Sequence, residues 1–123
     1  MRRGDIRYRY SMFKAQARRR NKRVELQRRE YEDIVRRPCL YCGSTHRIGI
    51  DRVRNDGHYT RENSVPCCAS CNYMKGTLRL RDFAERARCI GTQLGARWLE
   101  YAVGLNVRYF RSTHKVSRSV NMR

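Results

Sequence analysis

Apolar residues recur at helical spacing ahead of the first cysteines. Tyr31, Ile34 and Val35 lie three or four residues apart in a segment without glycine, so the pattern predicts a short helix over residues 28–36. Pro38 is expected to end it, because the residue before a proline is disfavoured in helical conformation.

A second apolar stripe follows the cysteine-rich segment and predicts a helix over residues 81–100. The spacing of three or four residues is typical of a helix face that packs in a core. The stripe consists of Phe83, Ala87, Ile90, Leu94 and Trp98. Residues 107–116 alternate enough to predict a strand, and a loose tail is expected after them.

The N-terminal part contains a further helical segment and one extended stretch. Residues 12–20 lack glycine and proline, which favours a helix. Val24 and Leu26 alternate with charged neighbours, which predicts a brief extended segment.

Composition limits the class of protein. With 123 residues, of which 40% are hydrophobic and 33% charged, one small domain is expected. No apolar run approaches the ~20 residues needed to cross a bilayer, and no signal-peptide pattern opens the sequence. We therefore expect an intracellular, reducing location and no membrane partner.

The formal net charge of +18 favours a polyanionic partner, because neutralised phosphates release counterions. Residues 1–38 hold 14 Lys and Arg against 5 Asp and Glu, residues 39–78 hold 5 against 3, and residues 79–123 hold 10 against 3. Two basic arms thus flank a nearly neutral centre, which suits nucleic acid. The residues expected to contact it are Arg18, Arg19, Arg20, Lys22, Arg23, Arg54 and Lys75.

Four cysteines in the centre predict a structural zinc site. Cys39/Cys42 and Cys68/Cys71 form two C-x-x-C pairs with 25 residues between them, a spacing that lets four thiolates surround one ion. Gly43 supplies the positive φ that a cysteine knuckle commonly uses. Disulfides are the alternative, but they require an oxidising compartment. Four sulfur ligands leave no open coordination position, so this zinc would stabilise the fold and not activate water.

The two remaining cysteines are expected to be structural. Cys67 would point away from the metal, since the two-residue spacing to Cys71 favours Cys68 as the ligand. Cys89 would be a small buried hydrophobe on the C-terminal helix.

The segment CLYCGSTHRIGIDRVRNDGHYTRENSVPCCASCNYMKGTL resembles the HNH endonuclease family, in the subgroup with a four-cysteine zinc knuckle. In that family a hairpin and a helix form a ββα unit that holds a catalytic divalent ion. Its shared elements are a strand ending in Asp-His, a glycine-containing turn, an Asn before the second cysteine pair and a His or Asn after it. The matching positions here are Asp51-Arg52, Gly57, Asn63 and Asn72.

The resemblance implies a role for each matching residue. Asp51 and Asn72 would ligate Mg²⁺ or Mn²⁺, and Asn63 would brace the loop by hydrogen bonds from its side chain to the backbone. The helix that begins near Cys71 would favour a phosphate, with Lys75 strengthening the anion site. Ordinary turn or cap roles for the two Asn residues are the alternative.

The sequence departs from the family at the general base. Arg52 replaces the expected histidine and stays protonated, so it cannot take a proton from water, although it could clamp a phosphate. His58 is the substitute candidate for the catalytic base, with a solvated turn residue as the alternative. Asp51 could instead form a structural ion pair with Arg52 or Arg54.

The resulting fold prediction is a small α+β, zinc-stabilised domain with a treble-clef-like ββα-metal core flanked by basic helices. Its predicted parts are a basic helical arm over residues 1–38, the zinc core over 39–78, a helix packed on the core over 79–105 and a basic tail over 106–123.

Two functions remain open at this point. The resemblance implies a metal-dependent DNA endonuclease or a descendant with weakened activity. The alternative is a non-catalytic zinc module that binds nucleic acid, DNA or RNA, for example within a ribonucleoprotein or nucleoprotein particle. Asp51, Asn63 and Asn72 favour the first hypothesis, and Arg52 favours the second.

Overall fold

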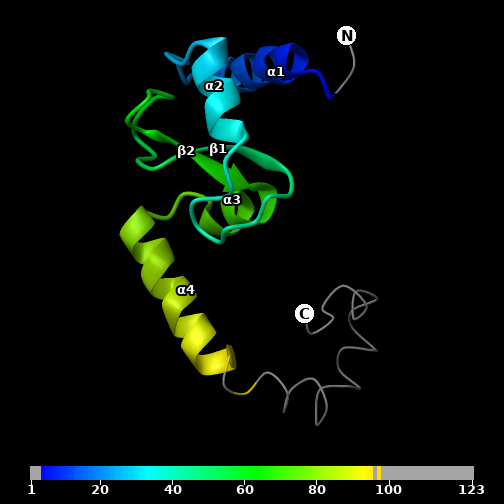
Figure 1. Ribbon diagram of the computed structural model, residues 1–123. Coiled ribbons are helices and arrows are strands. Elements are labelled where there is room, and N and C mark those ends of the chain that lie inside the picture. The colour runs from blue at the N-terminus through cyan, green and yellow to red at the C-terminus, as the bar shows by residue number, and fades with distance from the viewer. Residues whose placement is uncertain (1–3, 96, 98–123) are drawn as a thin grey trace, which may run out of the picture. The chain divides into compact units, whose positions relative to one another are not determined.

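The computed structural model describes residues 4–95 and 97. The chain divides into two units, residues 1–83 and 84–123, and each is considered by itself. Within the described residues there are four helices and one sheet of two strands, in the order α1 (Ile6–Arg19), α2 (Arg28–Val35), β1 (Ile48–Arg52), β2 (Ser64–Cys68), α3 (Ala69–Lys75) and α4 (Leu80–Gly95) (Figure 1). No helix among these residues is long and apolar enough to span a membrane. This is the α+β class that the sequence predicts.

Helix α1 begins six residues earlier than the predicted segment. The Asp5 side chain accepts a hydrogen bond of 2.8 Å from the backbone N–H of Arg7 and so caps the helix at Ile6. Arg18 and Arg19 lie in its last turn, where cations interact favourably with the helix dipole.

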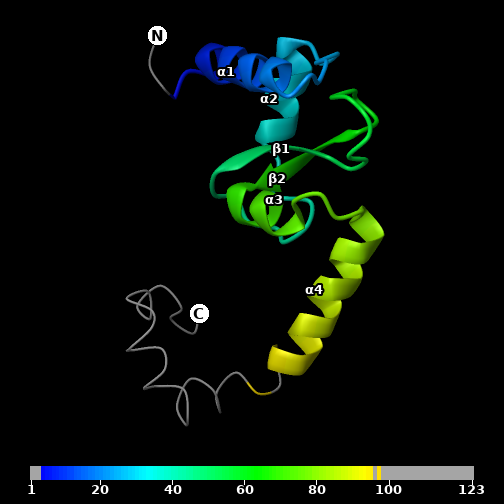
Figure 2. The ribbon, with the colours of Figure 1, turned by 180° about the vertical axis from the view of Figure 1, so that it is seen from behind.

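Helix α2 matches the prediction closely, and Gln27 and Glu30 form a capping box at its start. It lies between α1 and the sheet, as views from opposite sides show (Figures 1 and 2). The predicted extended segment is also confirmed, because Val24 forms an isolated bridge with Tyr59.

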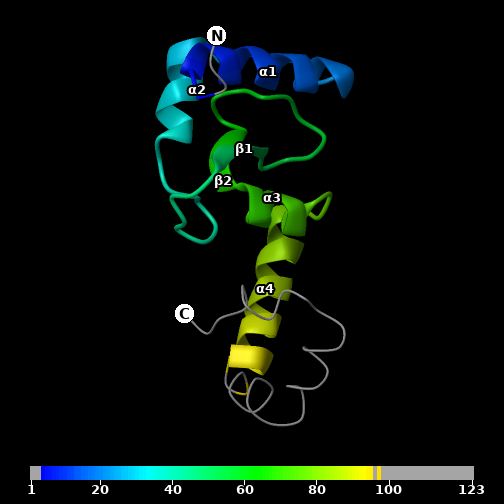
Figure 3. The ribbon, with the colours of Figure 1, turned by 90° about the vertical axis from the view of Figure 1, so that its right-hand side faces the viewer.

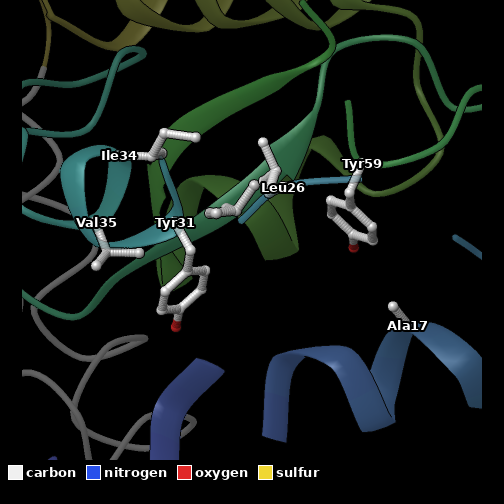
Figure 4. Packing of buried hydrophobic residues seen from close by; sticks show 7 residues of the cluster. Ala17, Leu26, Tyr31, Ile34, Val35 and Tyr59 are labelled. Atoms are coloured by element: carbon white, nitrogen blue, oxygen red, sulfur yellow. The ribbon is translucent and has the colours of Figure 1, made fainter. Parts of the chain in front are cut away.

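The main hydrophobic cluster joins the two N-terminal helices to the sheet and to the loop after β1 (Figure 4). Phe13 packs edge-on against Tyr59, with ring centroids 4.7 Å apart, and also contacts the Tyr31 ring. The buried members are Ala17, Leu26, Tyr31, Ile34, Val35, Ile50 and Tyr59.

Strands β1 and β2 pair antiparallel, with Gly49 opposite Cys67 and Asp51 opposite Val65. Residues 53–63 form the long loop between them, which passes close to the C-terminal end of α1 (Figure 3). Helix α3 follows β2 directly and contacts both strands. A second buried cluster, made of Cys39, Ile48, Cys67, Cys68 and Cys71, surrounds the junction of β2 and α3.

Helix α4 is confirmed over Leu80–Gly95, whereas positions 96 and 98–100 of the predicted helix lie outside the described residues. Phe83 is buried and packs edge-on against Tyr41, but Ile90 and Leu94 are 46% and 45% exposed. The prediction of a buried Cys89 is wrong, because that side chain is exposed. The packing of residues 79–105 on the core stays a prediction, and the expected strand over 107–116 also lies outside the described residues.

Candidate metal centre and nucleic-acid interface

The four predicted ligands, Cys39, Cys42, Cys68 and Cys71, come together in one cluster. Their sulfur atoms all lie within 4.8 Å of one another, and the sulfurs of Cys42 and Cys68 are 3.6 Å apart. A tetrahedral zinc with Zn–S bonds of about 2.3 Å places its sulfurs about 3.8 Å apart, whereas a disulfide would need about 2.05 Å. The donor set and its spacing therefore fit a structural zinc ion. Cys67 lies outside the cluster, as predicted.

Local backbone geometry builds this site. Gly43 has φ +77° and donates its N–H to the Cys39 carbonyl at 2.9 Å, which closes the first knuckle. In the second pair, Cys68 caps α3 and its sulfur accepts the Cys71 N–H at 3.4 Å. The first pair is thus held in a tight turn and the second in the first turn of α3, and the four sulfurs meet in one cluster.

The surroundings of the cysteines favour a thiolate at Cys39 and a thiol at Cys71. Burial opposes ionisation of Cys39, but N–H groups of Cys68, Cys42 and Tyr41 outweigh it and lower the pKa of Cys39 to about 6. Burial raises the pKa of Cys71 well above its usual range, and it also raises the pKa of Cys67, to about 12. Cys67 is therefore a protonated core residue.

Asp51, at the end of β1, is almost completely buried and has two partners on one carboxylate oxygen. The Tyr41 hydroxyl donates to Oδ2 at 2.7 Å, and the Lys75 ammonium lies 3.2 Å from the same atom. Burial and this hydrogen bond to the carboxylate raise the pKa of Tyr41, so its hydroxyl keeps its proton. Lys75 also contacts the Arg52 carbonyl at 3.2 Å and Asn55 Oδ1 at 3.3 Å, which uses all three ammonium protons.

Arg52 points into the loop that follows β1. Its Nη1 donates to the carbonyls of Asn55 and Gly57 at 2.5 and 2.6 Å, and its guanidinium lies 5.4 Å from the centroid of the Tyr59 ring. Arg52 therefore braces this loop from within.

Asn63 closes the same loop, in the bracing role that the resemblance implies. Its Oδ1 accepts the Arg54 N–H at 2.7 Å, and its Nδ2 donates to the Arg54 and His58 carbonyls at 3.1 and 2.9 Å. A Cβ at Gly57 would lie 2.7 Å from Asn63 Nδ2, so only glycine fits there without a shift.

A cleft of about 1000 Å³, here called the Asp51 cleft, opens between α1, β1, the following loop and α3. The basic residues that line it are Arg9, Arg20, Lys22 and Arg52. Among the described residues, Asp51 is the one acidic residue in its wall, and Lys75 neutralises that carboxylate. Tyr8 and Tyr73 also line the cleft, and Tyr73 is 90% exposed. The cleft is therefore cationic, with aromatic surface available.

The structure brings together some of the predicted site residues. Asp51, Arg52 and Asn72 share the wall of the Asp51 cleft with Arg20 and Lys22. The other basic residues expected to touch nucleic acid lie outside that wall: Arg18, Arg19, Arg23, Arg54 and Lys75.

Two of these placements correct the sequence analysis. Lys75 is 1% exposed and pairs with Asp51, so it supports the cleft wall from behind and does not face a ligand. Asp51 pairs with Lys75 and not with Arg52 or Arg54. His58 does not line the cleft, and its Nδ1 accepts the Arg23 N–H at 3.0 Å. When Nδ1 accepts this bond, the proton of the neutral ring lies on Nε2. Neither ring nitrogen is then free to take a proton from a water near Asp51.

Sequence reasoning missed Arg9 and Tyr41. Arg9 lies in the same helical stripe as Phe13, Gln16 and Arg20, and this spacing would have revealed it had the helix been predicted to begin at Ile6. Its Nη2 donates to the Ile48 carbonyl at 2.6 Å. No local signal marks Tyr41, because its partner Asp51 is ten residues away on another element.

Comparisons with known proteins agree with this architecture. No family model matches the chain. An uncharacterized protein of Acanthamoeba polyphaga mimivirus is 31% identical in an alignment of 85 residues, and the alignment covers 66% of this chain but only 16% of that protein's length. Among solved structures, the rare-cutting HNH restriction endonuclease PacI is similar with a TM-score of 0.57 and 18% identity, covering 76% of this chain and 82% of that one. The chain is therefore similar in fold to an HNH endonuclease and carries a four-cysteine cluster that fits a metal ion.

Proposed function

We propose that the protein binds nucleic acid, with DNA preferred, through the Asp51 cleft. The observation that carries this proposal is the charge of the cleft wall, which contains four cationic residues and one carboxylate that Lys75 already neutralises. Such a wall attracts phosphate groups and releases their counterions. The preference for DNA rests on the fold, since the structural neighbour is a restriction endonuclease.

Aromatic surface supports the same function. Tyr73 projects from α3 with 90% of its surface exposed, and Tyr8 lines the opposite, α1 side of the cleft. Tyrosine rings stack on bases or pack against sugars with little sequence preference. A groove for nucleic acid is expected to combine cations that bind the phosphate backbone with aromatic rings that contact the bases.

The proposal is tested by removing single charges and measuring affinity for a labelled 20-base-pair duplex by fluorescence anisotropy. Arg20→Gln and Lys22→Gln should each weaken binding by about tenfold, equal to about 1.4 kcal/mol. Each should also reduce the slope of log K against log salt by about 0.9, the value expected when one fewer phosphate is neutralised.

The matched control is Arg37→Gln, which removes the same charge from an exposed position beyond α2 and outside the cleft wall. It should bind almost as the wild type. Equal losses in all three variants would show that affinity comes from overall charge, and would overturn the assignment to the cleft.

A second candidate is metal-dependent hydrolysis of phosphodiester bonds. It is favoured by the presence of Asp51 and Asn72 in one cleft wall of an HNH-like fold. The residues fit a divalent ion poorly, however, because an ammonium lies 3.2 Å from the carboxylate oxygen that would ligate it. Arg52 cannot act as a base, and no histidine among the described residues lines the cleft. Binding without cleavage is therefore the preferred function.

Nicking of supercoiled plasmid with Mg²⁺ or Mn²⁺ separates the two candidates. We expect the wild type, Asp51→Asn and an EDTA control to show the same background. Nicking by the wild type that Asp51→Asn loses, while that variant keeps the wild-type circular dichroism spectrum, would instead establish the endonuclease.

A further inference from the structure

A second hollow adjoins the Asp51 cleft at the N-terminal end of β1. This Arg47 pocket has a volume of about 550 Å³ and shares four wall residues with the cleft, namely Arg9, Gly49, Ala69 and Asn72. The two hollows therefore meet along the middle of β1 and the start of α3.

The Arg47 pocket is also cationic. Arg9 and Arg47 line it, and no acidic residue in the described part of the chain does. The Arg9 guanidinium is fixed at the boundary of the two hollows by its hydrogen bond to the Ile48 carbonyl. Arg47 has φ +53°, in the left-handed region that disfavours non-glycine residues, and its carbonyl accepts the Ala69 N–H at 3.2 Å. The backbone thus holds Arg47 at the start of α3 with its side chain exposed.

We propose that the two hollows form one track for a single polynucleotide strand, in which the Arg47 pocket binds a phosphate next to the one held in the Asp51 cleft. This inference rests on the proposed function and extends it from one subsite to two. Arg9 contacts the strand between the subsites, and Arg47 contacts the second phosphate. Arginine suits this role, because its planar fork of donors matches phosphate oxygens.

Gly49 forms the floor where the two hollows meet. Its backbone is outside the left-handed region, and a Cβ there would meet only the Cys67 carbonyl oxygen, at 3.9 Å. Valine is well accepted in strands. A side chain at this position should therefore be compatible with the fold, and it would project into the junction of the track.

The test uses the full, zinc-loaded chain and the same labelled 20-base-pair duplex, together with a 20-nucleotide single strand. Arg47→Gln should lower affinity about tenfold and reduce the salt slope by about 0.9. The series Gly49→Ala, Gly49→Val and Gly49→Leu should lower affinity progressively as the side chain grows, while zinc content and melting temperature stay at wild-type values.

The outcomes distinguish the two levels of the proposal. Wild-type affinity in Arg47→Gln and Gly49→Val, with weaker binding in Arg20→Gln and Lys22→Gln, would overturn the second subsite and leave the first. Absence of binding by the wild type, or no effect of Arg20→Gln and Lys22→Gln, would overturn the proposed function itself. If the Gly49 variants lose zinc, Arg47→Gln decides alone, because the residue that it replaces is exposed.

Discussion

At the scale of single residues, Lys75 decides the chemistry of the cleft. Its side chain is fully buried, and its three protons meet Asp51 Oδ2, Asn55 Oδ1 and the Arg52 carbonyl at 3.2 to 3.3 Å. A buried charge is tolerated only when it is paired and hydrogen-bonded, and both conditions hold here. The pair therefore ties α3 to the end of β1 and neutralises the carboxylate at the same time.

Removing one partner of this ion pair should lower the stability of the fold more than removing both. We expect Lys75→Met to lower the free energy of unfolding by about 3–5 kcal/mol, because it leaves Asp51 buried and uncompensated. The double variant Lys75→Met/Asp51→Asn should recover much of that stability. Urea unfolding followed by circular dichroism measures both, with Asp51→Asn completing the cycle. Additive effects of the two substitutions would contradict the coupling.

In the sequence, Arg52 could be interpreted either as a phosphate clamp or as a structural residue, and its contacts in the structure favour the structural role. Next to a catalytic aspartate it could have clamped a phosphate, but its guanidinium donates to the Asn55 and Gly57 carbonyls. These bonds add to the backbone hydrogen bonds within the loop and satisfy two of its carbonyls, because backbone carbonyls need donors. Position 52 therefore shapes the cleft wall, whichever activity the cleft has.

At the scale of elements, the four-cysteine cluster lies between parts that have little apolar core of their own. Helix α3 has only seven residues, too few to be stable alone, and the cysteine cluster joins it to the turn after α2. A metal ion bound by these cysteines would supply free energy that a short helix and a two-stranded sheet do not.

Removal of zinc should therefore unfold this region. We expect a chelator to abolish the α3 helical signal and the β1–β2 pairing, measured by hydrogen exchange of their amides, while α1 and α2 lose less protection. Cys39→Ser and Cys71→Ser should show the same change, and Cys67→Ser, outside the cluster, should retain zinc. Equal protection with and without chelator would contradict the metal assignment.

The pH dependence of zinc binding has a defined sign. The Cys71 pKa is raised by burial, so this ligand is a thiol in the metal-free protein and must release a proton to bind zinc. Protons therefore compete with the ion, and zinc affinity, measured by competition with a chromophoric chelator, should fall as pH falls. Against the effect of burial, backbone N–H groups lower the pKa of Cys39, so this sulfur should contribute less to the pH dependence than Cys71 does.

At the scale of the whole molecule, positively charged residues occur throughout the sequence, but only a few of them line the cleft. The chain carries 29 Lys and Arg, yet only four of those in the described part line the Asp51 cleft. Dispersed charge attracts a polyanion from a distance, and only the charges that converge in a cleft can position it. The effect of a substitution on binding should therefore depend on its place and not on the net charge alone.

The sequence by itself determined the elements whose causes are local. Tyr31, Ile34 and Val35 specify one face of α2, and Pro38 and the capping box set its ends. The two C-x-x-C pairs specify the cysteine cluster, because a two-residue spacing is enough to aim both sulfurs of a pair at one point. The brace role of Asn63 also followed from a resemblance confined to one short segment.

Only the tertiary structure decided which polar residues meet. Lys75 and Asp51 are 24 positions apart, and their contact depends on how α3 packs against β1. Arg9 reaches the cleft because α1 begins at Ile6 and its first turns pass close to β1, whereas Arg18 and Arg19 of the same helix lie outside the wall. Side-chain spacing along the chain records the local period of a helix or strand, but it holds no information about which faces pack together. For that reason the sequence identified a cationic domain with a four-cysteine cluster, and the packing identified its cleft.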